Sequence, residues 1–355
     1  MTQSDEIRQE ARRNTRGRFE QWAKNPTCEA NTISAVHNVR LDKVAEAAGL
    51  APSFGQSPFA IARGNRFEAG LFYEEAQRLR VALERASVLS PDSTGFLDLR
   101  LKMNGGAHIK TVDAALAKTA QWLDDLAGGR AEASIVAAPM IRIPRGVILP
   151  EALLIIDAVA VTDGGGMPHL TVGEVKVFPD RGGHTDPRQL ASARAQAGLY
   201  RRALELTLES SGLEPAIRVN PEGFLVFTWP GSNMPVIRAH EDLTYQAIRA
   251  ERGFERLEQV AQGIVRDDDF SVDNATLVER VLHAPTHYSE ACLSFCDLAP
   301  RCFNRALAQD RPVILGTEAS QILAGVTMTR ALELIHGASP VTDREADLQR
   351  QMEQV

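Results

Sequence analysis

The amino-acid sequence predicts a mixed α/β protein, in which a core of strands and helices carries helical additions at both ends. Two observations lead to this class. Apolar residues recur at helical spacing before residue 127 and after residue 187, whereas apolar, β-branched runs separated by turn residues fill residues 133–178. The composition, with 44% hydrophobic and 24% charged residues in a chain of 355, is ordinary for a soluble globular protein.

The elements are expected in the following order. Helices are predicted over residues 4–23, 41–50, 57–87 and 110–127, the third with a break near Gly64. Three strands follow at residues 133–144, 151–161 and 169–178, separated by turn residues. The remaining elements are a helix over 188–212, strands over 223–230 and 234–239, a helix over 241–265 and a helical C-terminal end.

Composition also limits the partners. No apolar stretch reaches the roughly 20 residues that span a bilayer, and the first 24 residues are polar, so a cytoplasmic chain without membrane contact is expected. A net charge of −7 argues against binding of polyanions through the overall field, although a local basic groove would suffice for nucleic acid. Basic side chains gather near the strands: Arg142, Arg145, Arg181, Arg188, Arg194, Arg201 and Arg202.

Three charged residues stand inside two of the predicted strands. Asp157 interrupts the run LLII-AVAV, and Glu174 and Lys176 interrupt the next strand. A charge removed from water costs several kcal/mol unless it is paired or bound to metal. The two-residue period places Glu174 and Lys176 on one face, with Val175 and Val177 pointing into the core. Two converging carboxylates repel unless a cation lies between them, and such oxygen ligands suit Mg²⁺ or Mn²⁺.

An aspartate followed, after a hairpin, by Glu-x-Lys resembles the PD-(D/E)xK nuclease superfamily. Gln196 and Tyr200 lie four residues apart on the next predicted helix, as in the QxxxY motif of the RecB/Cas4-like branch. In that branch a glycine on an earlier helix is followed four residues later by a metal-binding histidine. Here Gly64 is followed by Glu68, whose carboxylate remains a competent Mg²⁺ ligand. The alternatives are a surface hairpin, a polar helix face and an exposed glutamate.

The four cysteines are too few for a disulfide scaffold and favour a metal or catalytic role. Cys28 stands alone, whereas Cys292, Cys296 and Cys302 follow the spacing C-x3-C-x5-C. This split arrangement resembles that of Cas4-like and AddB-like nucleases, whose four cysteines bind a 4Fe–4S cluster, and the usual spacing there is one residue shorter. Zn²⁺ on the same four thiolates is the main alternative, and unligated core cysteines are another. His283 and His287 lie close enough in sequence to be substitute ligands.

The resemblance implies a restriction-endonuclease-like core, a central mixed β-sheet flanked by helices. It also implies hydrolysis of DNA phosphodiester bonds with Mg²⁺ or Mn²⁺, as an exonuclease or on flaps and single strands. Asp157, Glu174 and Glu68 would be the metal ligands, Lys176 the catalytic lysine, and Gln196 and Tyr200 would orient the substrate or the lysine. Repair, CRISPR and antiviral defence all suit this chemistry.

Other functions remain open from the residues alone. A catalytically silent DNA-binding or assembly subunit would keep the same fold, and RNA could replace DNA as the substrate. The chain has no Walker A motif, so a helicase motor would be a separate protein partner. Four segments are expected: an N-terminal helical segment (1–56), a nuclease core (57–240), a helical segment with the last cysteines (241–310), and an extension (311–355) that is a candidate docking surface.

Overall fold

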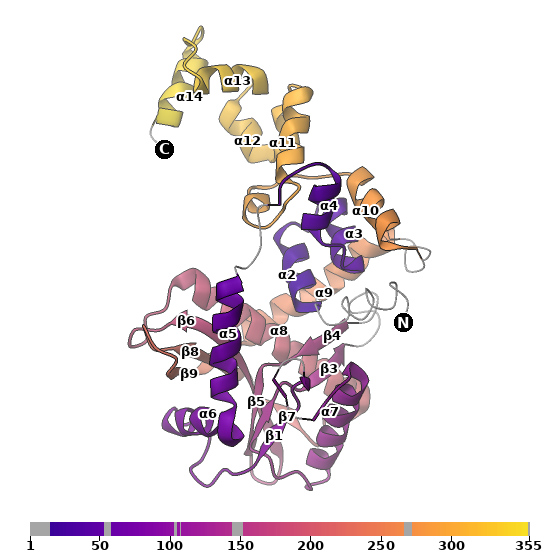
Figure 1. The fold of residues 1–355 in the computed structure, drawn as a ribbon, viewed down its shortest axis with the longest axis vertical. Helices are drawn as coiled ribbons and strands as arrows, with labels where there is room; N and C mark the ends of the chain where they lie inside the picture. Colours follow the sequence, from indigo (N-terminus) through magenta and orange to yellow (C-terminus); the bar gives the residue numbers. More distant parts are fainter. Residues whose placement is uncertain are drawn as a thin grey trace. The chain divides into compact units, whose positions relative to one another are not determined.

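The computed structural model describes residues 15–52, 58–102, 105–106, 108–143, 152–265 and 272–353 (Figure 1). Its contacts divide the chain into two compact units. One consists chiefly of Gly17–Gly55 and Gln259–Val355, and the other of Gln56–Glu258. The first part of the predicted helix over 4–23, up to residue 14, and Arg145 lie outside the described residues.

The larger unit is built on a mixed sheet of seven strands in the order β1-β2-β5-β6-β8-β9, with β7 beside β6. The strands are β1 (Phe96–Asp98), β2 (Ile135–Ala137), β5 (Ala158–Asp163), β6 (Pro168–Pro179), β7 (Arg218–Val219), β8 (Glu222–Thr228) and β9 (Pro235–Asp242). β2, β5 and β6 are antiparallel neighbours, whereas β6 and β8 are parallel. A parallel pair needs a crossover, which α8 (Pro187–Ser211) supplies as predicted.

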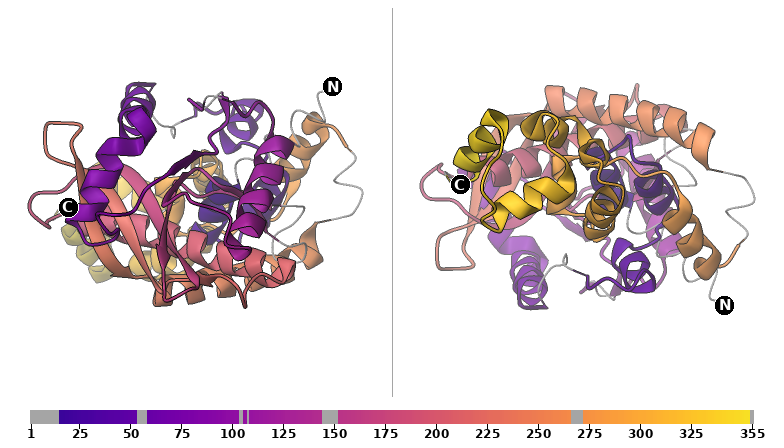
Figure 2. Two further views of the ribbon diagram at one scale, coloured as in Figure 1. Left: turned by 90° about the horizontal axis from the view of Figure 1, so that it is seen from below. Right: turned by 90° about the horizontal axis from the view of Figure 1, so that it is seen from above.

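Helices cover both faces of this sheet. α5 (Pro58–Leu71) and α6 (Tyr73–Arg85) lie on one face and α8 on the other (Figures 1 and 2). Beneath α5 and α6 a core of buried apolar residues includes Phe67, Leu71, Leu79, Leu83, Ile135, Phe224 and Val226. Val175 and Val177 of β6 pack against this core, which confirms their predicted direction. The architecture is therefore the expected central mixed sheet flanked by helices.

Two predicted strands are each broken into two. The expected strand over 133–144 is β2 followed by β3 (Met140–Ile143), and that over 151–161 is β4 (Ala152–Ile155) followed by β5. β3 and β4 form a separate two-stranded sheet. Both breaks occur at the same level, where Ala138 N–H donates to Asp157 O and Ile156 N–H donates to Pro139 O. One antiparallel ribbon thus bends from one sheet to the other, and Asp157 lies at the corner rather than inside a strand.

The long helix predicted over 57–87 does break, but not near Gly64, which lies inside α5. The break comes at Glu74, Glu75 and Ala76, whose φ angles are positive. Ala76 is fully buried in the core beneath the helices, as are Leu79 and Leu83 further along α6. Burial of these apolar side chains therefore decides where the helix bends, and the glycine does not.

Other elements match their predictions. α7 (Val112–Ala127) begins at Thr111, whose hydroxyl accepts a hydrogen bond from Ala114 N–H, and ends at Gly128. α9 (Thr244–Ile264) follows β9 as expected. The short strands β1 and β7 were not predicted, because runs of two or three residues carry too little periodicity.

The smaller unit is helical. Its elements are α2 (Thr15–Lys24), α3 (Glu29–His37), α4 (Leu41–Ala47), α10 (Asn274–His283), η3 (Glu290–Ser294), α11 (Ala299–Ala308), η4 (Pro312–Leu315), α12 (Gly316–Leu323), α13 (Met328–Ile335) and α14 (Asp343–Glu353). A core that includes Ile33, Val44, Leu277 and Val281 joins α3, α4 and α10. The sequence did not predict α3.

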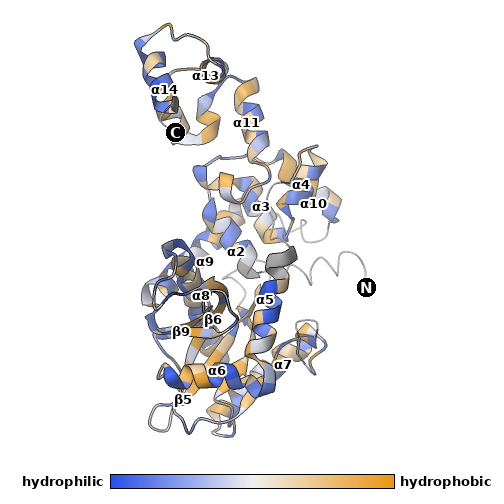
Figure 3. Ribbon diagram, turned by 60° about the vertical axis from the view of Figure 1, so that its left-hand side comes forward, coloured by the Kyte–Doolittle hydropathy of each residue, from blue (hydrophilic) through white to orange (hydrophobic). Residues whose placement is uncertain are grey.

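The helical C-terminal end was predicted, and it has a small core of its own, made of Val326, Ala331, Leu334 and Leu348. Figure 3 shows both hydrophilic and hydrophobic residues along α6 and α11, as in amphipathic helices. Within the described part of the chain, no helix has the length and apolar character needed to cross a membrane.

Candidate active site

The bend in the ribbon brings Asp157 to the strand that carries Glu174. In the β5–β6 ladder Ala158 lies opposite Gly173, so the next residues outward, Asp157 and Glu174, are cross-strand neighbours. The Asp157 carboxylate reaches β6 itself, because its Oδ2 accepts a hydrogen bond of 2.9 Å from Val175 N–H. The Asp157 carboxylate therefore lies against β6, beside the residue that carries the second carboxylate.

Glu174 is fully buried, and its Oε1 forms an ion pair with Lys176 Nζ. The two side chains leave β6 on the same face, as the two-residue period predicted. The lysine side chain is 18% exposed, so it reaches from the buried carboxylate towards solvent. A positive charge paired directly with the carboxylate offsets part of the free-energy cost of burying it. The pair explains how two charges can stand in the middle of a strand.

Helix α8 contributes Tyr200, which is fully buried. Its hydroxyl donates a hydrogen bond of 3.2 Å to Asp157 Oδ1. Both oxygens of the aspartate are thereby bonded, one to a tyrosine and the other to a backbone N–H, and the carboxylate is fixed in orientation. One turn earlier, Gln196 is 7% exposed, and no hydrogen bond to its Oε1 is found among the described residues.

Glu68 is half-buried on α5, a helix that packs against β6. In the described ranges, no group of three or more His, Cys, Asp and Glu side chains is arranged to hold a metal ion. The structure thus gathers Asp157, Glu174, Lys176 and Tyr200, and does not complete a three-carboxylate group with Glu68. The same finding applies to the cysteines.

All four cysteines belong to the smaller unit. None forms a disulfide. Asn25 Nδ2 donates to Cys292 Sγ at 3.2 Å and to His287 O at 2.7 Å, which ties the N-terminal segment to the region of the last three cysteines. A hydrogen bond from the Cys296 thiol lowers the pKa of Cys292, with further help from Ser289, and raises that of Cys296.

Burial raises the pKa of Cys28 and of Cys302, and the charge of Cys292 raises both further. The thiols are therefore close enough for the charge on one to affect the next.

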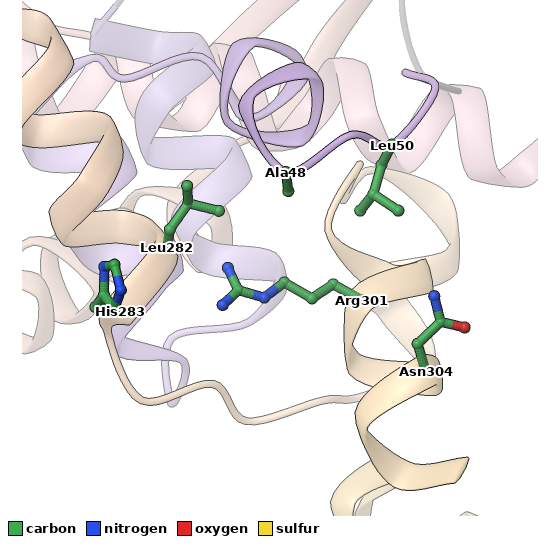
Figure 4. Close-up of a pocket in the computed structure, with 6 residues that line it drawn as sticks. All are labelled: Ala48, Leu50, Leu282, His283, Arg301 and Asn304. Atoms are coloured by element: carbon green, nitrogen blue, oxygen red, sulfur yellow. The ribbon is translucent and has the colours of Figure 1, made fainter. Parts of the chain in front are cut away.

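The smaller unit has two overlapping cavities, of which the smaller adjoins one of the cysteines. Figure 4 shows the larger, of about 390 Å³, with Arg301 extending between Leu282, His283 and Leu50. A cavity of about 180 Å³ shares His283 and Arg301 with it and is also lined by Cys302. His283 Nδ1 lies 2.8 Å from Glu279 O, and His287 Nδ1 lies 3.2 Å from Thr27 Oγ1.

A group of charged residues beyond the end of β6 was not predicted. Asp180 is fully buried. Burial disfavours its charge, but hydrogen bonds from Thr185, Gly183 and Arg238 outweigh this and lower the pKa of Asp180. Arg238 also pairs with Glu241 at 2.9 Å. The only sequence signal was the aspartate before two glycines, which is typical of a side-chain-stabilised turn.

Comparisons of the chain with models of protein families, with curated proteins and with solved structures each find no match. The interpretation of the site therefore depends on its geometry and on the sequence motifs.

Proposed function

We propose that this chain is a metal-dependent DNA nuclease of the RecB/Cas4-like type with a restriction-endonuclease-like core. The observation that carries the proposal is the joining of Asp157, Glu174 and Lys176 at the bend of the ribbon. Asp157 bonds to the backbone of β6 next to Glu174, Glu174 pairs with Lys176, and a tyrosine from the next helix holds the aspartate. Carboxylates are ligands that suit Mg²⁺ and Mn²⁺, and a lysine can stabilise negative charge that develops on a phosphate.

Asp157 and Glu174 would hold Mg²⁺ or Mn²⁺, with Glu68 as a candidate third ligand from α5. The bound ion would supply Lewis-acid stabilisation of the phosphate and activation of a water molecule. Val175 N–H and the Tyr200 hydroxyl keep the Asp157 carboxylate in one orientation. Lys176 would move from its ion pair with Glu174 to stabilise negative charge that develops on the phosphate oxygens. Gln196 would orient the lysine or the substrate backbone.

In the smaller unit, we propose that Cys28, Cys292, Cys296 and Cys302 bind a 4Fe–4S cluster, with Zn²⁺ as the alternative. Thiolates are the ligands that both prefer. Hydrogen bonds from Cys296, Ser289 and Asn25 stabilise the Cys292 thiolate, the protonation state that metal binding needs. This expectation rests on the donor set, since the thiols are not arranged as a metal site in the described residues.

The proposal includes a cytoplasmic protein that works with a partner such as a helicase or a defence-complex protein in repair, CRISPR or antiviral defence. The C-terminal segment exposes apolar side chains that its own small core does not cover: Val313, Ile322, Ile335 and Val341. We expect this segment to be the docking surface. Truncation at about residue 310 should abolish assembly with the partner, and unchanged assembly would contradict this.

A second candidate is a catalytically silent DNA-binding or assembly subunit. One observation favours it: Lys176 pairs with Glu174, and the carboxylates at the bend do not form a three-ligand group within the described ranges. In this case the ammonium group of Lys176, and not a metal ion, would compensate the buried charge of Glu174, and the pair would only stabilise the fold.

The deciding experiment is cleavage of end-labelled single-stranded and double-stranded DNA, and of RNA of the same sequence, with Mg²⁺ or Mn²⁺. Wild type is compared with Lys176→Ala and Asp157→Ala, and with Lys110→Ala, which replaces an exposed lysine of the same unit. Loss of cleavage in the first two variants alone supports the nuclease. Absence of cleavage by correctly folded wild type on every substrate favours the silent subunit.

The protein is purified without oxygen so that its visible spectrum can be recorded. A brown chromophore with iron and sulfide supports the 4Fe–4S cluster, and colourless protein with one zinc supports the alternative. Protein with neither metal, and unchanged folding when all four cysteines are replaced, would contradict both.

A further inference from the structure

Trp229 is the exposed tryptophan of this chain. Its side chain is 55% exposed, whereas Trp22 and Trp122 are 2% and 4% exposed. Trp229 begins the turn between β8 and β9. Its backbone N–H donates to the backbone oxygen of Met234, on the other side of that turn, at 2.8 Å. Met234 is 60% exposed. Two large exposed apolar residues therefore flank the turn at the tip of one hairpin.

β6 carries Glu174 and Lys176 of the candidate active site, and its C-terminal end lies beside this hairpin. β6 and β8 are parallel, and Pro179 lies opposite Thr228, so the two strands end side by side (Figure 1). Asp180 N–H donates to Thr228 O at 3.0 Å. At about 3.3 Å per residue, the four residues from Lys176 to Asp180 span roughly 13 Å. The exposed tryptophan is therefore within a few nucleotides of the proposed catalytic lysine.

The loop that begins at Asp180 is held rigidly. Asp180 Oδ1 accepts from Gly183 N–H at 2.7 Å, and its Oδ2 accepts from the Thr185 hydroxyl at 2.8 Å. Arg238 of β9 donates to Gly183 O at 2.7 Å. Arg238 and Arg194 both pair with Glu241, so charges inside this network are compensated. The network fixes the backbone of the loop against the hairpin.

The same loop presents cations to solvent. Arg181 is exposed at its tip, and Arg188 is exposed in the first turn of α8. Neither side chain forms an ion pair in the part of the chain that the structure describes. Asp186, an exposed carboxylate on the same loop, accepts hydrogen bonds from the backbone N–H groups of Arg188 and Gln189 as the cap of α8. His184 is exposed on the loop as well.

We propose that Trp229, with Met234, stacks against an unpaired base of a nucleic-acid strand, and that Arg181 and Arg188 bind its phosphates. The inference rests on the proposed nuclease function and assigns the residues that would bind an unpaired strand beside that site. Aromatic side chains beside cationic groups are the usual means of binding single strands without base specificity. In a duplex the bases stack on each other and are not offered to the indole, so this surface selects unpaired ends.

The test uses the three tryptophans of the full-length protein, in buffer without divalent cations. A 12-nucleotide oligothymidylate is titrated against wild type, and a 12-base-pair blunt duplex is the comparison. Because only Trp229 is exposed, saturable quenching of the exposed fraction by the single strand is expected, with little quenching by the duplex. Trp229→Phe should abolish the quenching but keep most of the affinity measured by anisotropy of a labelled strand.

Trp229→Ala should weaken single-strand binding by about 5- to 150-fold, the range for one stacked base. Tyr245→Ala is the matched control, since Tyr245 is 66% exposed on α9 and should leave the affinity unchanged. Arg181→Ala and Arg188→Ala should each reduce the salt dependence of binding, with a slope lower by about one. Circular dichroism checks that each variant folds.

Equal affinity of Trp229→Ala and wild type, equal quenching by duplex, or no binding of the single strand would each overturn the inference. Cleavage that needs Lys176 but occurs without quenching would leave the nuclease standing and refute the stacking surface. Quenching by single strands without any cleavage in Mg²⁺ would support the stacking surface and refute the nuclease. Oligouridylate in place of oligothymidylate would show whether RNA is bound equally well.

Discussion

Replacing Tyr200 by phenylalanine removes one hydroxyl group and almost no volume. That hydroxyl donates a hydrogen bond of 3.2 Å to Asp157 Oδ1, and the ring is fully buried, so no cavity forms and the change falls on the hydrogen bonding of the hydroxyl group. A hydrogen bond to a charged group contributes about 1.5 to 3 kcal/mol. Asp157 is half-buried, and water can replace part of the bond. We therefore expect Tyr200→Phe to lower the free energy of unfolding by about 1 to 2 kcal/mol.

The assay is urea unfolding of wild type, Tyr200→Phe, Asp157→Asn and the double variant. If the hydroxyl acts through the aspartate, the double variant should lose less than the sum of the single variants, by about 1 kcal/mol. Additivity within about 0.3 to 0.5 kcal/mol would refute the coupling.

In the cleavage assay the aspartate would lose the bond from the tyrosine hydroxyl and keep its bond from Val175 N–H. A loss of 1 to 2 kcal/mol in the transition state corresponds to a fall in kcat of about 5- to 30-fold. An unchanged kcat would mean that the orientation of Asp157 does not limit the reaction.

Three further predictions concern stability. A Cβ on Gly173 would lie 2.1 Å from ring carbons of the buried Phe224, so Gly173→Ala should cost about 1 to 3 kcal/mol in urea unfolding; unchanged stability would show that the ring can move. Burial, with nearby arginines, lowers the pKa of His37 from 6.5 to about 4. The unfolded chain then binds more protons below pH 6.5, so stability should fall from pH 6.5 to 4 by up to about 3 kcal/mol, and His37→Gln should remove this dependence. Arg330 donates to both oxygens of Glu345, at 3.1 and 2.9 Å, and lowers the pKa of Glu345 to about 2. Glu345→Gln should speed hydrogen exchange in α13 and α14 at pH 7 and leave the exchange of β6 unchanged.

The periodicity of apolar residues predicted the long elements that bury only one face. The helices over 110–127 and 188–212 and the face shared by Glu174 and Lys176 follow directly from spacing. The alternation in β6 also fixed which residues enter the core. The positions of Glu174 and Lys176 could therefore be predicted. Once Val175 and Val177 face the core, the alternation of the strand places both charged residues on the opposite face.

What the sequence did not reveal depends on contacts between distant residues. The corner at Asp157 is set by two hydrogen bonds, from Ala138 N–H to Asp157 O and from Ile156 N–H to Pro139 O, which no local pattern encodes. The bend after α5 depends on burial of Ala76, and the network of Asp180 depends on Arg238, 58 residues away. Tyr200 was singled out by its motif, but its partner, Asp157, was not predicted.

The separation along the chain between interacting residues implies an order of events during synthesis. Tyr200 follows Asp157 by 43 residues, whereas Cys292 follows Asn25 by 267. At about 5 to 20 residues per second, the first pair is complete within roughly 2 to 9 seconds and the second only after roughly 13 to 53 seconds. The nascent chain would thus carry an assembled carboxylate corner while Cys28 still waits for its neighbours. During that interval the Cys28 thiol lacks its neighbours of the folded protein and is most open to oxidation.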